Sequence, residues 1–335
     1  MSAAVSPERV LKELGELWIS LARAEQSEGA TVVRACSMTL IAATGATGEE
    51  SPAGEVIASL MREHPSRAIV LRVAPDDPGR LESRVFAQCW RPHGGRQQIC
   101  CEQVEITASR DMLGDVAALL SGILAPDLPV VVWCRESSLL LTPEFRPILP
   151  LAHKLIFDSS GFADQHEVLR GLPDLGRTGC VLADLNWTRV TRWRQAVAEA
   201  FDSPARRAKV KDLEELSICY RTPEIPPGAW YLWAWVEHAL GRSIRVRFRH
   251  ACEGPGLAIQ EIALSGPGIT VSVARTEGDA VQLRRDSLSS GVVFPPQPEY
   301  GLVGEELSLL EADPLYDIVL ERACALAQSN RGGDP

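Results

Sequence analysis

The first half of the chain alternates short apolar runs with segments of helical periodicity, and this alternation restricts its fold more than any other feature. The run TVVRACSMTLIAAT, at residues 31–44, is β-branched and apolar and predicts a strand. A helix is expected next, because Ser51-Pro52 supplies an N-cap and a first-turn proline. The run SRAIVLRVAP, at residues 66–75, predicts a second strand. Strand, helix and strand in so short a stretch indicate two parallel strands joined by a right-handed crossover.

The alternation continues to about residue 176 and predicts an α/β fold with a mostly parallel sheet. Residues 85–90 and 97–106 flank the sequence RPHGGR, so we expect them to form a hairpin that extends this sheet. The other elements expected in this half are helices at 5–25, 111–124 and 143–152, a strand at 128–134, and a strand that ends near Asp158.

A different pattern after residue 177 predicts a smaller α+β domain with antiparallel strands. Its expected elements are one helix within residues 182–206, a strand at 212–221, a helix at 226–241, strands at 243–250, 257–265, 268–275 and 280–285, and a last helix at 314–328. Because Gly-Pro and Glu-Gly-Asp turns separate the last four strands, they indicate an antiparallel meander. A chain of 335 residues exceeds a typical single domain, so we expect domains at residues 1–177 and 178–335.

Charge and hydropathy exclude several classes of partner. The net charge is −10, whereas nucleic acids and anionic membranes are bound by basic faces, so neither partner is expected. No window approaches the 18 apolar residues of a membrane span. The N-terminal residues MSAAVSPERVLKELGELW predict an acidic amphipathic helix rather than a signal peptide. We therefore expect a cytoplasmic protein.

The nine cysteines are expected to be reduced, because their number is odd and their spacings do not repeat. Cys100 and Cys101 are adjacent in a predicted strand, where neighbouring side chains point to opposite faces. One of these thiols is therefore expected to be buried and the other exposed. A redox role for the exposed thiol is the alternative.

Signatures of catalysis and cofactor binding are absent from the sequence. It contains no GxGxxG, no GxxxxGK[ST], no HExxH, no CxxC and no GxSxG motif. The six histidines do not have the spacing of metal ligands. We therefore expect no enzyme activity, no cofactor and no metal.

The segment LADLNWTRVTRWRQAVAEAFDSPAR, at residues 182–206, combines tryptophans with arginines. On a helical wheel its apolar residues share one arc, which indicates packing on a core; these are Trp187, Val190, Trp193, Val197, Ala200 and Phe201. Asp184 or Asn186 is expected to cap the helix. Core packing does not explain Arg189, Arg192 and Arg194, because cations near a helix start oppose its dipole.

Three interpretations of this cluster stay open. Arginine and tryptophan are typical anchors of protein interfaces, so the cluster could dock a partner. It could instead hold a phosphate at the helix start. Thirdly, the arginines could lie over the tryptophans as structural cation–π partners.

Polar residues also follow two predicted strands, in WCRESS at 133–138 and FDSSGF at 157–162. Ligands and partners collect at the carboxyl ends of parallel strands, which makes Asp158 and Ser159 candidates. The alternative is that these residues close the turn and cap the next helix.

Five segments in order resemble the OpcA family of glucose-6-phosphate dehydrogenase assembly proteins. They are RACSMTLI at 34–41, HPSRAIVL at 64–71, PDLPVVVWCRESS at 126–138, KLIFDSSGF at 154–162 and DLNWTRVTRWRQAVAEAFD at 184–202. The chain departs from the family pattern in two places. WCRE, at 133–136, stands where the family has a second tryptophan and a glycine, and Thr191-Arg192-Trp193 stands where it has T-P-W.

The resemblance implies a bacterial, chaperone-like partner protein rather than an enzyme. Family members bind glucose-6-phosphate dehydrogenase, promote its active oligomer and act as activators in the oxidative pentose phosphate pathway. The candidate partner-binding residues in this chain are Trp187, Arg189, Arg192, Trp193, Arg194, Asp158 and Ser159. The alternative function is an enzyme or sensor that binds a sugar phosphate or nucleotide at the strand ends and the arginine cluster.

Overall fold

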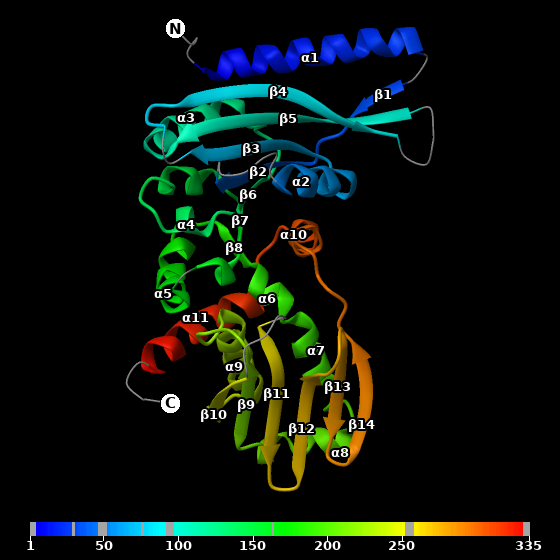
Figure 1. The fold of residues 1–335 in the computed structure, drawn as a ribbon, viewed down its shortest axis with the longest axis vertical. Helices are drawn as coiled ribbons and strands as arrows, with labels where there is room; N and C mark the ends of the chain where they lie inside the picture. Colours follow the sequence, from blue (N-terminus) through cyan, green and yellow to red (C-terminus); the bar gives the residue numbers. More distant parts are fainter. Residues whose placement is uncertain are drawn as a thin grey trace. The chain divides into compact units, whose positions relative to one another are not determined.

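A computed structural model describes residues 5–28, 31–45, 52–74, 77–91, 97–162, 164–251 and 258–330. The chain packs as two units, and each unit is discontinuous in sequence (Figure 1). Unit 1 comprises residues 1–161, 174–183 and 299–311, and unit 2 comprises residues 162–173, 184–298 and 312–335. The division between residues 177 and 178 stays a prediction.

Unit 1 is built on a sheet of eight strands in the order β1-β5-β3-β2-β6-β7-β8, with β4 paired to β5. The strands are β1 (Thr31–Arg34), β2 (Met38–Gly45), β3 (Ser66–Ala74), β4 (Leu81–Trp90), β5 (Gln97–Ser109), β6 (Val130–Cys134), β7 (Lys154–Phe157) and β8 (Val181–Asp184). The β4–β5 pair is the predicted antiparallel hairpin, and the pairs β2–β3, β3–β5, β2–β6 and β6–β7 are parallel. The predicted α/β class with a mostly parallel sheet is therefore confirmed.

The crossover predicted at the start of the chain is present, but its first strand is shorter than expected. The helix α2 (Pro52–Glu63) connects β2 to β3, which pair in parallel with Ile41 opposite Ile69. The expected single strand at 31–44 is wrong, because β1 and β2 are separate strands: β1 pairs with β5, whereas β2 lies between β3 and β6. Both pieces are rich in apolar and β-branched residues, so the sequence pattern continues across them although they pair with different strands.

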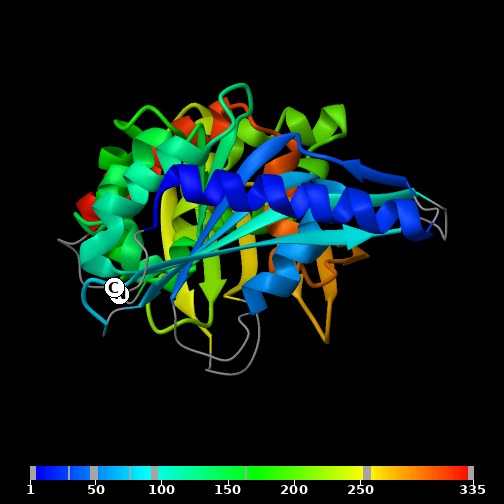
Figure 2. The same ribbon diagram turned by 90° about the horizontal axis from the view of Figure 1, so that it is seen from above.

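Helices of unit 1 cover the sheet with apolar residues. The helix α1 (Pro7–Glu28) buries Val10 and Leu14, and it runs along β4 and β5 in the view of Figure 2. The other helical segments are α3 (Leu113–Ile123), α4 (Ser137–Leu140) and the 3-10 helices η2 (Arg110–Met112), η3 (Arg146–Leu151) and η4 (Ser159–Gly161). The helix at 111–124 is confirmed, and the one at 143–152 is a short 3-10 turn.

A buried carboxylate ties α1 to three strands of this sheet. Glu102 of β5 is 1% exposed and accepts a hydrogen bond from Trp18 Nε1 of α1 at 2.9 Å. It also accepts from Arg34 Nη2 of β1, at 3.0 and 2.9 Å, and from Arg67 Nε of β3. Burial alone raises the pKa of Glu102, but the Trp18 hydrogen bond and the two guanidinium charges together lower it below its ordinary value. The carboxylate is therefore stabilised in its charged form.

The helix α10 (Glu299–Ser308) joins unit 1 from far along the chain through two ion pairs. Lys154 of β7 is 2% exposed, and its Nζ donates to Glu306 Oε2 and to the Leu309 carbonyl, each at 2.7 Å. Arg135 makes a bidentate pair with Glu299, at 2.8 and 2.9 Å. The sequence pattern did not predict α10.

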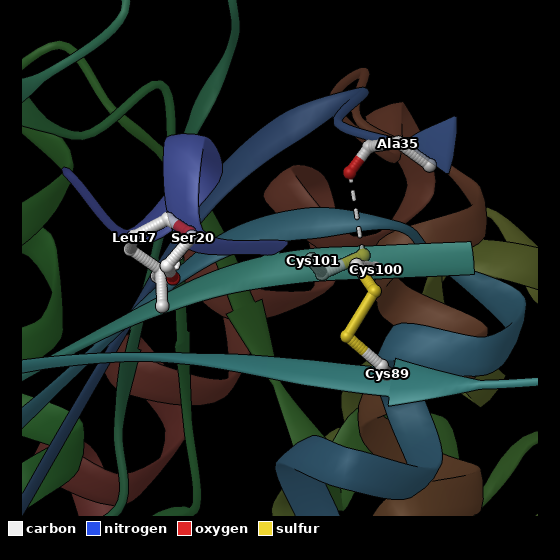
Figure 3. The surroundings of a disulfide bond; sticks show 6 residues. All are labelled: Leu17, Ser20, Ala35, Cys89, Cys100 and Cys101. Carbon is white, nitrogen blue, oxygen red and sulfur yellow. Dashed lines mark hydrogen bonds between the residues drawn. A yellow bond between two sulfur atoms is a disulfide. The ribbon is translucent and has the colours of Figure 1, made fainter. Parts of the chain in front are cut away.

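The expectation of reduced cysteines is wrong for Cys89 and Cys100, which form a disulfide across the β4–β5 pair (Figure 3). The two residues are directly opposite in the antiparallel register, with Cα atoms 4.1 Å apart. Cys101 does not provide the expected exposed thiol either, since it is fully buried and donates from Sγ to the Ala35 carbonyl. Burial raises the pKa of the Cys101 thiol to about 11.

Unit 2 contains a second sheet of six strands in the order β10-β9-β11-β12-β13-β14. The strands are β9 (Glu215–Tyr220), β10 (Arg245–His250), β11 (Ile259–Gly266), β12 (Ile269–Arg275), β13 (Ala280–Arg285) and β14 (Leu288–Val293). The predicted α+β class is confirmed. The predicted meander holds for β11 to β13, but β10 is parallel to β9, and β14 was not predicted.

The helices of unit 2 differ from the sequence prediction in one important place. The expected single helix within 182–206 is wrong, because that segment begins in β8 and continues as α6 (Leu185–Arg189), α7 (Thr191–Glu199) and α8 (Pro204–Arg207). The predicted helices α9 (Pro227–Leu240) and α11 (Pro314–Ser329) are confirmed and contact each other. The 3-10 helix η5 (Val210–Asp212) precedes β9, and α5 (Gln165–Gly176), which spans the division between the units, was not predicted.

Replacing Glu102 by Gln is expected to destabilise unit 1 by about 3 kcal/mol at neutral pH, because Arg67 then loses its buried countercharge. The folded-state pKa of Glu102 is depressed, so its contribution is present above the ordinary pKa of 4.5 and is lost as the pH falls through the folded value. Urea unfolding of wild type and variant at pH 7 and about pH 3 measures this. The control Glu105→Gln, on the same strand but in a partly exposed pair with Arg72, should cost less than about 1 kcal/mol. Equal stability of wild type and Glu102→Gln at pH 7 would contradict the role of this carboxylate.

Reduction of the unfolded chain is expected to release two additional thiols, because Cys89 and Cys100 are joined. Thiol titration in denaturant, before and after treatment with a reductant, counts them. In the Cys89→Ser/Cys100→Ser variant the two counts should agree. An unchanged count in the wild-type chain would rule the disulfide out.

Candidate functional site

The start of α6 is fixed by a fully buried carboxylate. Asp184 caps this helix, as one of the two predicted alternatives, because its Oδ1 accepts from the Asn186 backbone N–H at 2.9 Å. Its Oδ2 accepts from the Tyr231 hydroxyl of α9 at 2.6 Å. Burial and the negative charge of Asp184 both raise the pKa of Tyr231 well above its ordinary value, so this hydroxyl remains a donor.

The tryptophans of the segment lie in the core of unit 2. Trp187 is 4% exposed, donates from Nε1 to Asp313 Oδ2 at 2.8 Å, and packs against the rings of Tyr231 and Tyr316. Trp193 is 3% exposed and meets Phe294 edge to face, with ring centroids 5.4 Å apart. The predicted packing of the apolar arc on a core is therefore confirmed. Because both rings are buried, we expect them to contribute to partner binding by positioning the neighbouring arginines.

A break at Val190 separates α6 from α7 and redirects the chain. Val190 has φ −85° and ψ 1°, and it is both the C-cap of α6 and the N-cap of α7. A Cβ at Gly228, in the first turn of α9, would lie 3.1 Å from Val190 Cγ1, so the absence of a side chain there permits the close approach. Arg189 and Arg192 therefore project from two short helices rather than from one.

Arg194 has a structural role. Its guanidinium carbon lies 3.4 Å from the centroid of the Trp187 ring, and its Nη2 donates to Thr191 Oγ1 at 2.9 Å. This contact matches the third interpretation, an arginine held over a tryptophan, and a role of Arg194 in partner binding stays a prediction.

Arg189 and Arg192 line a cavity of about 80 Å³ within unit 2. Arg275 of β12 lines the same cavity, and its guanidinium lies over the rings of Trp193 and Phe294, at 5.5 and 5.9 Å. The described residues of the lining are Asn186, Arg189, Val190, Arg192, Trp193, Pro226, Gly228, Ala258, Ile259, Arg275, Phe294, Pro295 and Gln297. The sequence did not single out Arg275, because it lies on another element, and only the fold brings it to the other two arginines.

The described lining residues supply cations and amides. Three guanidinium groups and two side-chain amides line the cavity, and no Asp, Glu, His, Ser or Cys is among the described residues of its lining. A nucleophile paired with a general base cannot be assembled from these residues. The described residues likewise include no group of three His, Cys, Asp or Glu side chains that could hold a metal ion. The arrangement can bind an anionic group.

The candidates at the strand ends of unit 1 are engaged in a turn. Asp158 Oδ1 accepts from the backbone N–H and the hydroxyl of Ser160, at 3.0 and 2.6 Å. Ser159 is fully buried, and Ser137 Oγ donates to the Asp158 carbonyl at 3.4 Å. These contacts match the turn-closing alternative, and a role of Asp158 and Ser159 in partner binding stays a prediction.

Comparison with protein families matches most of the chain. Residues 57–173 match a model described as the N-terminal domain of the glucose-6-phosphate dehydrogenase subunit, and residues 180–320 match the C-terminal domain of the same subunit. The OxPP cycle protein OpcA of Synechocystis is 30% identical over 184 residues, which are 54% of this chain and 38% of that protein. OpcA of Synechococcus elongatus is 29% identical over 216 residues, 62% of this chain and 46% of that protein. The match thus spans less than half the length of these relatives.

Among solved structures, an oxidoreductase from Sinorhizobium meliloti is similar over 89% of this chain and 99% of that chain. The TM-score is 0.51 and the sequence identity is 10%, so the likeness concerns the fold alone. In the described part of the chain, every helix is too short or too polar to cross a membrane.

Replacing Arg194 by Ala is expected to lower the free energy of unfolding of unit 2 by about 1–2 kcal/mol, because the cation–π contact covers a buried ring. Arg192→Ala, two residues away, should change it by less than about 0.5 kcal/mol. Urea unfolding followed by tryptophan fluorescence compares the two variants. Equal effects of the two substitutions would contradict the distinction between Arg194, which covers the Trp187 ring, and Arg192, which lines the cavity.

Proposed function

Because the chain belongs to the OpcA family of glucose-6-phosphate dehydrogenase subunits, we propose that it binds glucose-6-phosphate dehydrogenase and activates it. Binding promotes the active oligomer of the enzyme and so increases flux through the oxidative pentose phosphate pathway. The chain acts as a non-catalytic assembly factor, in the cytoplasm, where this enzyme works.

The observation that carries this proposal is the match of residues 57–173 and 180–320 to the two domains of one subunit family. The lining of the arginine cavity agrees with it, because guanidinium groups without a nucleophile or base suit recognition. The similarity to an oxidoreductase fold does not weigh against it, since one fold carries many functions.

We place the partner contact on Arg189 and Arg192. Both side chains are half-buried where they line the cavity, and Arg189 Nη1 donates to Asn186 Oδ1 at 3.3 Å, which orients its guanidinium. Arginine with this support is a frequent hot spot of protein interfaces, where it pairs with a carboxylate of the partner. The chain carries a net charge of −10 and repels an acidic partner at long range. A partner carboxylate is therefore attracted only where cations such as Arg189 and Arg192 are locally exposed to it, and this determines which face of the chain it docks on.

The double variant Arg189→Ala/Arg192→Ala is expected to weaken activation of the dehydrogenase at least tenfold in the concentration required. A loss of about 1.4 kcal/mol of binding free energy corresponds to a tenfold change in affinity, and a single interface arginine can contribute more binding free energy than that. Activity of the dehydrogenase from the same organism, titrated with each form of the chain, gives the measurement.

The matched control is Arg245→Ala/Arg247→Ala, which removes the same charge from exposed positions on β10. It should activate like the wild-type chain. If the double variant at 189 and 192 activates normally, or if both double variants fail equally, the contact is not at this cavity.

A further inference from the structure

The arginine cavity is lined by a third cation, Arg275, that the partner contact does not use. The Nε atom of Arg275 is buried and has no hydrogen-bond partner among the described residues. The Arg275 guanidinium carbon lies 5.5 and 5.9 Å from the ring centroids of Trp193 and Phe294, and these cation–π contacts hold the group in place. A buried donor left without an acceptor is costly, which points to an acceptor supplied by a ligand.

Two of the cations at this cavity, Arg192 and Arg275, form no ion pair among the described residues. Arg189, Arg192 and Arg275 converge on the cavity, and the described residues of its lining include no carboxylate. Arg192 makes no ion pair or hydrogen bond within the described residues, and Asp279 is the acidic residue that acts on Arg275 from nearby. Burial lowers the pKa of Arg275, as expected of a cation that lacks a close countercharge, although an arginine remains protonated.

The size of the cavity restricts the ligand to one terminal group. Its volume of about 80 Å³ is below the roughly 150 Å³ of a cavity that holds benzene. A whole nucleotide does not fit, whereas a phosphate group does.

The number of donors favours phosphate over carboxylate. A phosphomonoester carries a charge of about −1.5 to −2 at pH 7 and presents three terminal oxygens, so it can accept from Arg275 and Arg192 at the same time. A carboxylate presents two oxygens and a single charge. The amides of Asn186 and Gln297 add further polar atoms to the lining.

We propose that this cavity binds the phosphate group of a small phosphomonoester, with Arg275 as the inner ligand and Arg192 and Arg189 at the mouth. The rest of the ligand extends outward past Arg192. Occupancy of this site makes the chain respond to the concentration of a phosphorylated metabolite. This is a function in addition to binding the dehydrogenase. The two proposals share Arg189 and Arg192, whereas Arg275 belongs to the phosphate site alone, so Arg275→Gln tests phosphate binding without altering the proposed partner contact.

The test is isothermal titration of the full chain with inorganic phosphate at constant ionic strength in chloride, repeated with glucose 6-phosphate and with acetate. We expect one saturable site for phosphate, with glucose 6-phosphate bound at least as tightly and acetate at least tenfold more weakly. Arg275→Gln should raise the Kd for phosphate at least tenfold. The control Arg284→Gln should change it less than twofold, because this arginine of β13 donates to Gln282 and does not line the cavity.

Circular dichroism establishes whether Arg275→Gln is folded, and Arg192→Gln serves as a second variant that is expected to weaken phosphate binding at least threefold. Absence of saturable phosphate binding by the wild-type chain overturns the proposal. Phosphate binding that both cavity variants leave unchanged also overturns it. If acetate binds as tightly as phosphate and depends on Arg275, the cavity is a carboxylate site and the phosphate assignment is wrong.

Discussion

The buried carboxylate of Asp184 is the interaction on which the arginine site depends. It satisfies the backbone N–H of Asn186 at the start of α6 and the hydroxyl of Tyr231 on α9 at the same time. A buried charge is tolerated when it is hydrogen-bonded in this way, and each partner then fixes the other. The ring of Trp187, one turn further, is locked by Asp313 and Tyr316. The arginines that follow therefore start from a rigid base rather than from a flexible loop.

This base explains how one short segment carries arginines with different roles. Arg194 lies over Trp187 and contributes to stability, whereas Arg189 and Arg192 line the cavity where the chain changes direction at Val190. Had the segment been a single continuous helix, all three would have projected from one rod. Arginines near a helix start lower helix stability because their charge opposes the helix dipole. The same charges favour the binding of an anion or an acidic partner at this position. Arginines that are unfavourable for the helix can therefore be retained for recognition.

Local patterns predicted the elements whose stability is local. The β2–α2–β3 crossover, the β4–β5 hairpin and α9 follow from apolar periodicity and proline placement, while the predicted cap at Ser51 lies outside the described residues. Features that depend on distant residues were missed. The pairing that separates β1 from β2, the disulfide between Cys89 and Cys100, and the attachment of α10 through Lys154 all require knowledge of which strands are neighbours. Arg275 was missed for the same reason, because nothing in its own strand marks it apart from other exposed-looking arginines. The sequence also predicted that the tryptophans pack in a core. Because they are buried, the more accessible side chains of this segment are the arginines beside them.

The central claim is that this chain binds and activates glucose-6-phosphate dehydrogenase, and the most direct measurement uses the two purified proteins. They are mixed, separated by size-exclusion chromatography with light scattering, and the peaks are assayed for dehydrogenase activity. The account predicts a peak that contains both chains, with a mass above that of the enzyme alone and a higher specific activity. Separate elution of the two proteins with unchanged activity would contradict it.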